Sequence, residues 1–192
     1  MARLDRGAVL QAATELANIS GLNNVTLKDL AQKLGVRSPS LYNHIQGMDD
    51  LHTALMLHGW KQLGEKITLA AVGKAGDDAV RAMCRSFYDY ATGNPGVFEA
   101  MMWINQHNSP ESEMATTHLA KLVALVLESY KLNEQEQIHA SRMFRSFLQG
   151  FTSIVNNNSF ADPISVNASF DYAVEIMIKG LSLQLQNNGE AE

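Results

Sequence analysis

The chain has 192 residues, of which 46% are hydrophobic and 18% charged, enough apolar sequence to bury a sizeable core. Its formal net charge is −5, but residues 1–47 hold five basic and three acidic residues, a balance of +2 that leaves −7 for the rest. The single cysteine, Cys84, excludes an intrachain disulfide framework. Neither a signal-peptide pattern nor an apolar run of about 18 residues occurs, so we expect a cytoplasmic protein.

Apolar residues recur at helical spacing along the whole chain, which predicts an all-α protein. The first predicted helix begins at Asp5 or Arg6, runs to about residue 19 and ends at Gly21. A second, short helix begins at Thr26, whose hydroxyl can cap it, with Asp29 three residues later in a variant of the capping box. One face of that helix is apolar and comprises Leu27, Leu30, Ala31 and Leu34.

A tight turn and a third helix follow. Gly35 suits the left-handed conformation that often ends a helix, and Val36 gives the turn an apolar anchor. Ser38 is predicted to cap the third helix, with Pro39 as its first residue. Leu41 and Ile45 point to the core, and the outward residues are Arg37, Ser38, Ser40, Tyr42, Asn43 and His44.

This outward set suits a surface that meets DNA. Hydroxyl, phenol and imidazole groups can hydrogen-bond phosphate oxygens, whereas Arg37 and Asn43 have the geometry to discriminate bases. No acidic residue lies between Ala31 and Gly47. Each residue alone could equally be an ordinary solvated helix position, but the ordered set after a capped helix and a glycine turn favours a helix that reads the major groove.

More helices are predicted beyond residue 47. The fourth spans about residues 48–70, the fifth about 77–93, and a short one follows Asn94-Pro95. Ser109-Pro110 opens a helix to about residue 130, and Asn133 with Glu136 opens another to about residue 155. A last helix contains Phe170 and ends near residue 185. We therefore divide the chain into a DNA-binding domain, 1–47, and a helical domain, 48–192.

The segment LAQKLGVRSPSLYNHI is similar to the helix-turn-helix of the TetR family of bacterial transcriptional regulators. The resemblance implies that Thr26, Tyr42 and His44 contact phosphates. It also implies that bases are read by Arg37, Ser38 and Ser40. One departure is clear: where the family often has a phosphate-contacting lysine at the start of the fourth helix, this chain has Met48 followed by two aspartates.

The C-terminal part has a looser resemblance. The segments FYDYATGNPGVFEAM, FRSFLQGFTSIVNNNSF and SFDYAVEIMIKGL resemble the WHG-type C-terminal domain of one branch of TetR regulators. The resemblance implies a homodimer in which the last two long helices pair with their copies. The interface residues expected on this basis are Phe151, Phe170, Val174, Met177, Ile178 and Leu181. Gly150 and Gly180 would permit close approach of helices, although Gly180 could also be a merely tolerated glycine.

The same resemblance implies a pocket for a small-molecule effector. An aromatic and methionine-rich lining, suited to a hydrophobic or planar ligand, would be formed by Phe87, Tyr88, Phe98, Met101, Met102, Trp103 and Phe144. Each of these could instead be plain core, as we expect for Cys84 in preference to a redox sensor. No HxxxH or CxxC spacing predicts a metal site, and no cofactor is expected.

These observations predict a ligand-responsive transcriptional regulator that binds double-stranded DNA as a homodimer on a pseudo-palindromic operator. Repression is inherited from the resemblance. An enzyme is disfavoured because the sequence contains no P-loop, no G-x-S-x-G and no dinucleotide fingerprint. The alternative is a DNA-binding protein without small-molecule response, either constitutive or controlled by a protein partner.

Overall fold

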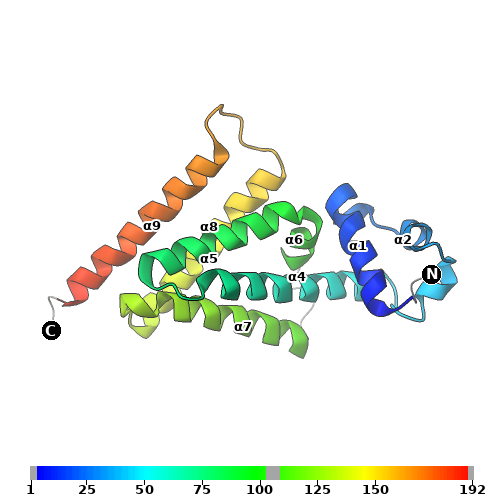
Figure 1. Ribbon diagram of the computed structural model, residues 1–192, viewed down its shortest axis with the longest axis horizontal. Coiled ribbons are helices and arrows are strands. Elements are labelled where there is room, and N and C mark those ends of the chain that lie inside the picture. The colour runs from blue at the N-terminus through cyan, green and yellow to red at the C-terminus, as the bar shows by residue number, and fades with distance from the viewer. Residues whose placement is uncertain (1–3, 103–108, 190–192) are drawn as a thin grey trace. The chain divides into compact units, whose positions relative to one another are not determined.

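The computed structural model describes residues 4–102 and 109–189, with side chains described as far as residue 184. Within these ranges every regular element is a helix, which confirms the predicted all-α class (Figure 1). None of these helices is long and apolar enough to cross a membrane. The elements in chain order are α1 (Arg6–Ser20), η1 (Leu22–Asn24), α2 (Leu27–Leu34), α3 (Ser38–Leu41), α4 (Met48–Ala71), α5 (Gly76–Gly93), α6 (Pro95–Met102), α7 (Pro110–Leu127), η3 (Glu128–Tyr130), α8 (Glu134–Asn156) and α9 (Val166–Gly189).

The chain forms two compact units. The first comprises residues 1–62 and 93–116, and the second residues 63–92 and 117–192. We call the first, which contains α1, α2, α3 and α6, the α1–α6 unit, and the second, which contains α5, α8 and α9, the α5–α9 unit; α5 lies in the second and α6 in the first. The three helices before residue 47 thus share a unit with α6 and the first part of α4. The functional boundary at residue 47 stays a prediction.

Side-chain caps start several helices where the sequence predicts them. Asp5 accepts a hydrogen bond from the backbone N–H of Ala8 at 2.8 Å and so caps α1. Asn133 and Glu136 form a reciprocal capping box at α8. Because the first backbone N–H groups of a helix have no partner within it, these side chains fix where each helix begins.

One predicted cap is wrong. Arg37, not Ser38, is the N-cap of α3, and it makes no side-chain cap hydrogen bond. Ser38 is the first helical residue, and Pro39 therefore occupies the second position. The shift is physically tolerable because the N–H that proline lacks would be unpaired anywhere in the first turn.

The α1–α6 unit has a core drawn from all its helices. Its innermost side chains are fully or almost fully buried and include Val9, Ala13, Leu22, Leu30, Leu41, Ile45, Leu51 and Leu55. A second contact region joins α1 to α6. The Asn18 amide oxygen accepts hydrogen bonds from the backbone N–H groups of Gly96 at 3.1 Å and Val97 at 3.2 Å. In return, the Glu99 carboxylate of α6 accepts a hydrogen bond from the Leu22 N–H at 3.1 Å.

The α5–α9 unit is held by apolar packing and by ion pairs. Cys84 is buried there, as predicted for a core residue, and burial raises the pKa of its thiol to about 12. Arg81 binds both carboxylate oxygens of Glu175, at 2.5 and 3.0 Å, and so links α5 to α9. An aromatic cluster lies beside it, formed by Tyr88, Phe147, Phe151, Phe160 and Phe170.

The structure corrects the expected dimer-facing side of α9. Phe170, Val174, Ile178 and Leu181 are 1–6% exposed within a single chain, so almost no surface is left on them for a second subunit. Phe151 and Met177 are half-buried. The exposed apolar residues of α9 are Tyr172, Ile176 and Leu183. Apolar periodicity identified the helix but not its outward face, because both faces are apolar.

The closest packing between α1 and α6 generates a stability prediction. A Cβ atom on Gly96 would lie 2.1 Å from the backbone oxygen of Ala17, which cannot move without distorting α1. We expect Gly96→Ala to lower the free energy of unfolding by about 1–3 kcal/mol, measured by urea denaturation. Gly93→Ala is the matched control, since nothing lies within 4 Å of its Cβ position. Equal urea midpoints for the two variants would contradict this account of the α1–α6 contact.

Candidate nucleic-acid interface

The start of α2 is fixed by a threonine cap. The backbone N–H of Asp29 donates to the Thr26 hydroxyl at 3.2 Å, and that hydroxyl donates its proton to the Asp29 carboxylate at 2.6 Å. The capping role predicted for Thr26 is confirmed. Because its proton is already donated, a phosphate contact by the same hydroxyl would have to compete with Asp29.

The turn between α2 and α3 has the geometry predicted from its glycine. Gly35 has φ +66° and ψ +29°, in the left-handed region, and its N–H donates to Gln32 O at 3.1 Å. The N–H of Val36 donates to Ala31 O at 3.0 Å. These two bonds form a Schellman motif, which ends α2 sharply and allows α3 to start three residues later.

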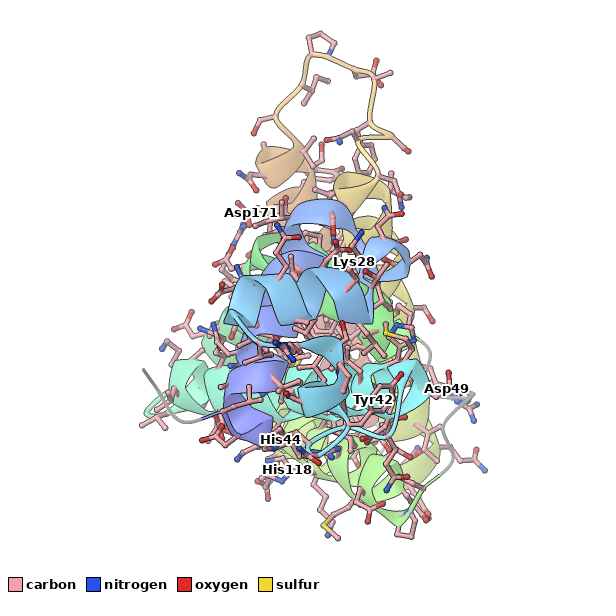
Figure 2. All side chains as sticks on the ribbon, turned by 90° about the vertical axis from the view of Figure 1, so that its right-hand side faces the viewer. Lys28, Tyr42, His44, Asp49, His118 and Asp171 are labelled. Atoms are coloured by element: carbon pink, nitrogen blue, oxygen red, sulfur yellow. The ribbon has the colours of Figure 1, made fainter. Side chains whose placement is uncertain are left out.

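Apart from Thr26, which caps α2, the residues predicted to bind DNA lie within or just before α3 and in the segment after it. Leu41 and Ile45 are buried, as expected, and they anchor this region to the core. Arg37 and Asn43 are exposed, and Tyr42 is 59% exposed although it is a large aromatic residue. Half-buried members of the set are Ser38, Ser40 and His44. Figure 2 views the molecule from the end that carries α2 and α3.

The charged groups near α2 and α3 differ in whether they are paired. Lys33 binds Glu15 at 2.8 Å and lowers the pKa of that carboxyl. Arg6 binds Asp50 at 2.8 Å and likewise lowers the pKa of Asp50. Among the residues that the structure describes, Lys28 and Arg37 have no ion-pair partner. These two cations are therefore free to meet phosphates.

Lys28 is a DNA-contact candidate that the sequence analysis missed. It is exposed in the first turn of α2, and it is labelled with Tyr42 and His44 in Figure 2. The available signal was its place two residues after the Thr26 cap, at a helix N-terminus that favours anions. A lysine here can supply positive charge that Met48 does not.

The residues predicted to line an effector pocket are placed in different units. Phe98, Met101 and Met102 belong to the α1–α6 unit, where the first two are buried and Met102 is half-buried. Phe87, Tyr88 and Phe144 are buried in the α5–α9 unit. Trp103 lies outside the described residues. The effector pocket stays a prediction, and no group of three potential metal ligands occurs in the described part of the chain.

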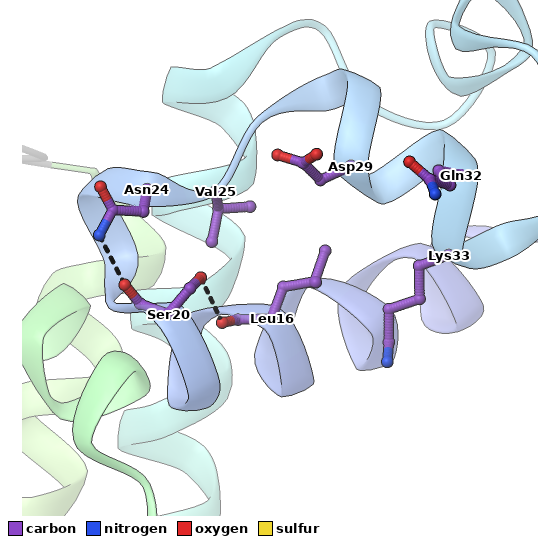
Figure 3. Close-up of a pocket in the computed structure, with 7 residues that line it drawn as sticks. All are labelled: Leu16, Ser20, Asn24, Val25, Asp29, Gln32 and Lys33. Carbon is purple, nitrogen blue, oxygen red and sulfur yellow. Dashed lines mark hydrogen bonds between the residues drawn. The ribbon is translucent and has the colours of Figure 1, made fainter.

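A shallow groove of about 390 Å³ lies between α1, η1 and α2 (Figure 3). Its lining residues are Leu16, Ser20, Asn24, Val25, Asp29, Gln32 and Lys33. Most of its polar groups already serve local structure: the Ser20 hydroxyl donates to Leu16 O at 2.8 Å, and the Asn24 amide donates to Ser20 O at 2.6 Å. We therefore assign no ligand to this groove.

A capped helix, a Schellman turn and a short helix with exposed hydrogen-bonding side chains define a helix-turn-helix DNA-binding protein. Comparison with protein families gives the particular class. Residues 9–55 match the model of bacterial regulatory proteins of the tetR family, and residues 80–177 match that of the tetracyclin repressor-like C-terminal domain. The chain belongs to the TetR family of DNA-binding transcriptional regulators.

Relatives and solved structures agree with this assignment. An uncharacterized HTH-type transcriptional regulator of Bacillus subtilis (strain 168), YobS, is 30% identical over 185 residues, which cover 96% of each chain. A protein of unknown function from Rhodococcus sp. RHA1 has the same fold, with a TM-score of 0.79 and 14% identity over 92% of this chain and 95% of that one. BioQ in complex with its double-stranded DNA operator has a TM-score of 0.69 and 17% identity, over 94% of this chain and 99% of that one.

Lys28 and Lys33 of α2 are expected to play different roles in DNA binding, because only Lys33 is held in an ion pair. We expect Lys28→Gln to weaken binding to all sequences and to reduce the slope of log K against log salt by about 0.9, as for one lost phosphate contact. Lys33→Gln is the control, because its ammonium group is already paired with Glu15. Binding of each variant to one duplex at several salt concentrations measures the slope. An unchanged slope for Lys28→Gln would remove Lys28 from the interface.

Proposed function

We propose that the protein is a homodimeric repressor that binds a pseudo-palindromic operator and is released from it by a small hydrophobic or aromatic effector. The observation that carries the proposal is the set of exposed and half-buried hydrogen-bonding side chains around α3, anchored to the core by the buried residues Leu41 and Ile45. In this proposal Arg37, Ser38 and Ser40 read bases. The phosphate contacts belong to Thr26, Tyr42 and His44, with Asn43 as a further base reader and Lys28 as an added phosphate contact.

The outward faces of α8 and α9 support dimer formation. Met143 and Ile154 of α8 are 40% and 42% exposed, and Tyr172 and Ile176 of α9 are 71% and 50% exposed. Two residues along a helix correspond to a turn of about 200°, so Ile176 lies almost opposite the buried Val174. Apart from their own helices' backbone and their chain neighbours, nothing lies within 4 Å of the Cβ positions of Gly150 and Gly180 on these helices. A twofold mate could pack closely there and supply the second reading helix, about 34 Å from the first.

The bonds between α1 and α6 support an effector response. Phe98 and Met101, two of the predicted pocket residues, lie on α6, which is bonded to α1 through Asn18 and to η1 through Glu99. In this proposal an effector that binds one arrangement of α6 more tightly than another biases α1 and, with it, the reading helices. The size of the bias cannot exceed the effector's differential affinity for the two arrangements.

The alternative is a DNA-binding regulator without small-molecule response. A thermal-shift screen separates the two, since a ligand that binds only the folded protein raises its melting temperature. Compounds that stabilise the protein would then be added to the operator complex. Release of the DNA supports the effector proposal, whereas stabilisation without release, or no stabilisation by any apolar or aromatic compound, favours the alternative.

Selection of bound sequences from a random DNA pool, at a stated salt concentration, tests operator recognition. We expect the wild-type protein to recover a palindrome with half-sites about one helical turn apart. Tyr42→Phe should weaken binding to every sequence. Arg37→Ala should in addition relax the preference at one or two positions and cost about 1–3 kcal/mol on the operator. An unchanged affinity and preference for Arg37→Ala would refute its base-reading role.

The dimer surface is tested by placing a charge on the outward face of α9. We expect Ile176→Asp to convert the dimer to a monomer, because a carboxylate in an apolar interface loses its hydration without a partner. Leu69→Asp is the matched control, since Leu69 is an exposed leucine, 75% accessible, on α4. Light scattering coupled to size-exclusion chromatography measures the mass. A dimer that survives Ile176→Asp, or a wild-type monomer, would reject this surface.

A further inference from the structure

One guanidinium joins three parts of the α1–α6 unit. Arg6 of α1 donates from Nη1 to the backbone oxygen of His44 at 3.0 Å and from Nη2 to Oδ1 of Asp50 at 2.8 Å. A second bond from Nη1 reaches Oδ2 of Asp50 at 3.3 Å, so the guanidinium and the carboxylate meet side by side. The backbone N–H of Gln46 also donates to Asp50 Oδ2, at 2.9 Å. The end of the reading segment and the start of α4 are thus held by one ion pair.

The ion pair lies beside a backbone carbonyl group, that of His44, which Arg6 binds directly. Residues 42–44 follow the last residue of α3, and the N–H groups of both His44 and Ile45 donate to the oxygen of Leu41. The carbonyl groups at a helix end have no partner further along the helix, and a cation there is favourable. Arg6 supplies that partner for His44. The direction of the segment that carries Tyr42 and His44 therefore depends on a residue 38 positions earlier.

The negative charge of Asp50, considered by itself, should weaken DNA binding. A carboxylate close to residues that contact phosphates repels DNA and should weaken binding to any sequence. Asp49, its neighbour in the first turn of α4, is exposed and has no ion-pair partner among the described residues. Asp50 differs from Asp49 in that it is bound to Arg6 and to the Gln46 N–H.

We propose that Arg6 and Asp50 are positioning residues, which hold residues 42–46 in the conformation that reads the operator and raise sequence preference without touching DNA. The inference rests on the proposed function as a sequence-specific regulator. It assigns to an acidic residue a favourable effect on specific binding. Simple electrostatics predicts the reverse, so the two effects differ in sign.

Asp50→Asn in the full-length protein separates them. Binding is measured to the selected operator duplex and to a scrambled duplex of equal length, at one salt concentration. If Asp50 positions the reading segment, affinity for the operator falls about three- to tenfold, while affinity for the scrambled duplex stays constant or rises. If Asp50 acts only through its charge, both affinities rise together and their ratio stays that of the wild type.

Asp49→Asn is the matched control, because it makes the same change of charge one residue away. We expect it to raise both affinities equally and to leave their ratio unchanged. Arg6→Lys retains the positive charge but loses the bidentate geometry of the guanidinium, so its ratio should lie between those of the wild type and Asp50→Asn. Thermal unfolding is recorded for each variant. If Asp50→Asn does not fold, the ratio measured for Arg6→Lys decides the question.

The outcomes distinguish failure of the positioning role of Arg6 and Asp50 from failure of the proposed function on which it rests. A wild-type protein that selects an operator, together with equal ratios for Asp50→Asn and Asp49→Asn, would overturn the positioning role and leave the proposed function intact. A wild-type protein that shows no preference at low salt would overturn the proposed function itself. A reduced ratio for Asp50→Asn alone is the result we expect.

Discussion

The first turn of α6 is completed by a side chain of α1. Helix N-termini leave backbone N–H groups without partners, and the usual solution is a capping residue just before the helix. Here the Asn18 amide, about 78 positions earlier in the chain, accepts two of these bonds. The lack of a side chain on Gly96 allows that reach, because a Cβ there would collide with the Ala17 backbone. Because α6 cannot keep this cap if α1 moves away, residues 93–102 belong to the same compact unit as α1, α2 and α3.

The short helices α2 and α3, proposed to read DNA, likewise depend on contacts outside themselves. An isolated helix shorter than about 12 residues is marginal in water, and α2 and α3 are shorter than that. Their conformation must therefore be stabilised by other interactions: the Thr26 cap, the Schellman turn at Gly35, the buried Leu41 and the ion pair between Arg6 and Asp50. The conformation of these short helices is therefore set by local caps together with buried contacts and long-range bonds, rather than by helix propensity.

Whether the sequence could predict an interaction depends on how far apart the two residues lie along the chain. Caps and turns act within about four residues, so the starts of α2 and α8 and the end of α2 were predicted correctly. Ser38 was misassigned because its neighbour Pro39 fits the first or second helical position equally well. The bonds of Arg6 and Asn18 to distant residues leave no periodic pattern, and no local rule indicates them.

The outward face of α9 illustrates a different limit. Phe170 and Tyr172 are both aromatic and lie only two residues apart, yet one is 1% and the other 71% exposed. Hydrophobicity cannot say which of two apolar faces meets the chain's own core. Contacts with the neighbouring helices decide it: Phe170 packs against Tyr88 of α5 and against Phe147 of α8. The ion pairs Arg81–Glu175 and Arg85–Asp171 also join α5 to α9, but their side chains are partly exposed. The arginines recur four residues apart on α5, as do the acids on α9, so both pairs can form at once. Exposed pairs contribute little to stability, so the rotation of α9 follows mainly from the burial of Phe170 and Val174.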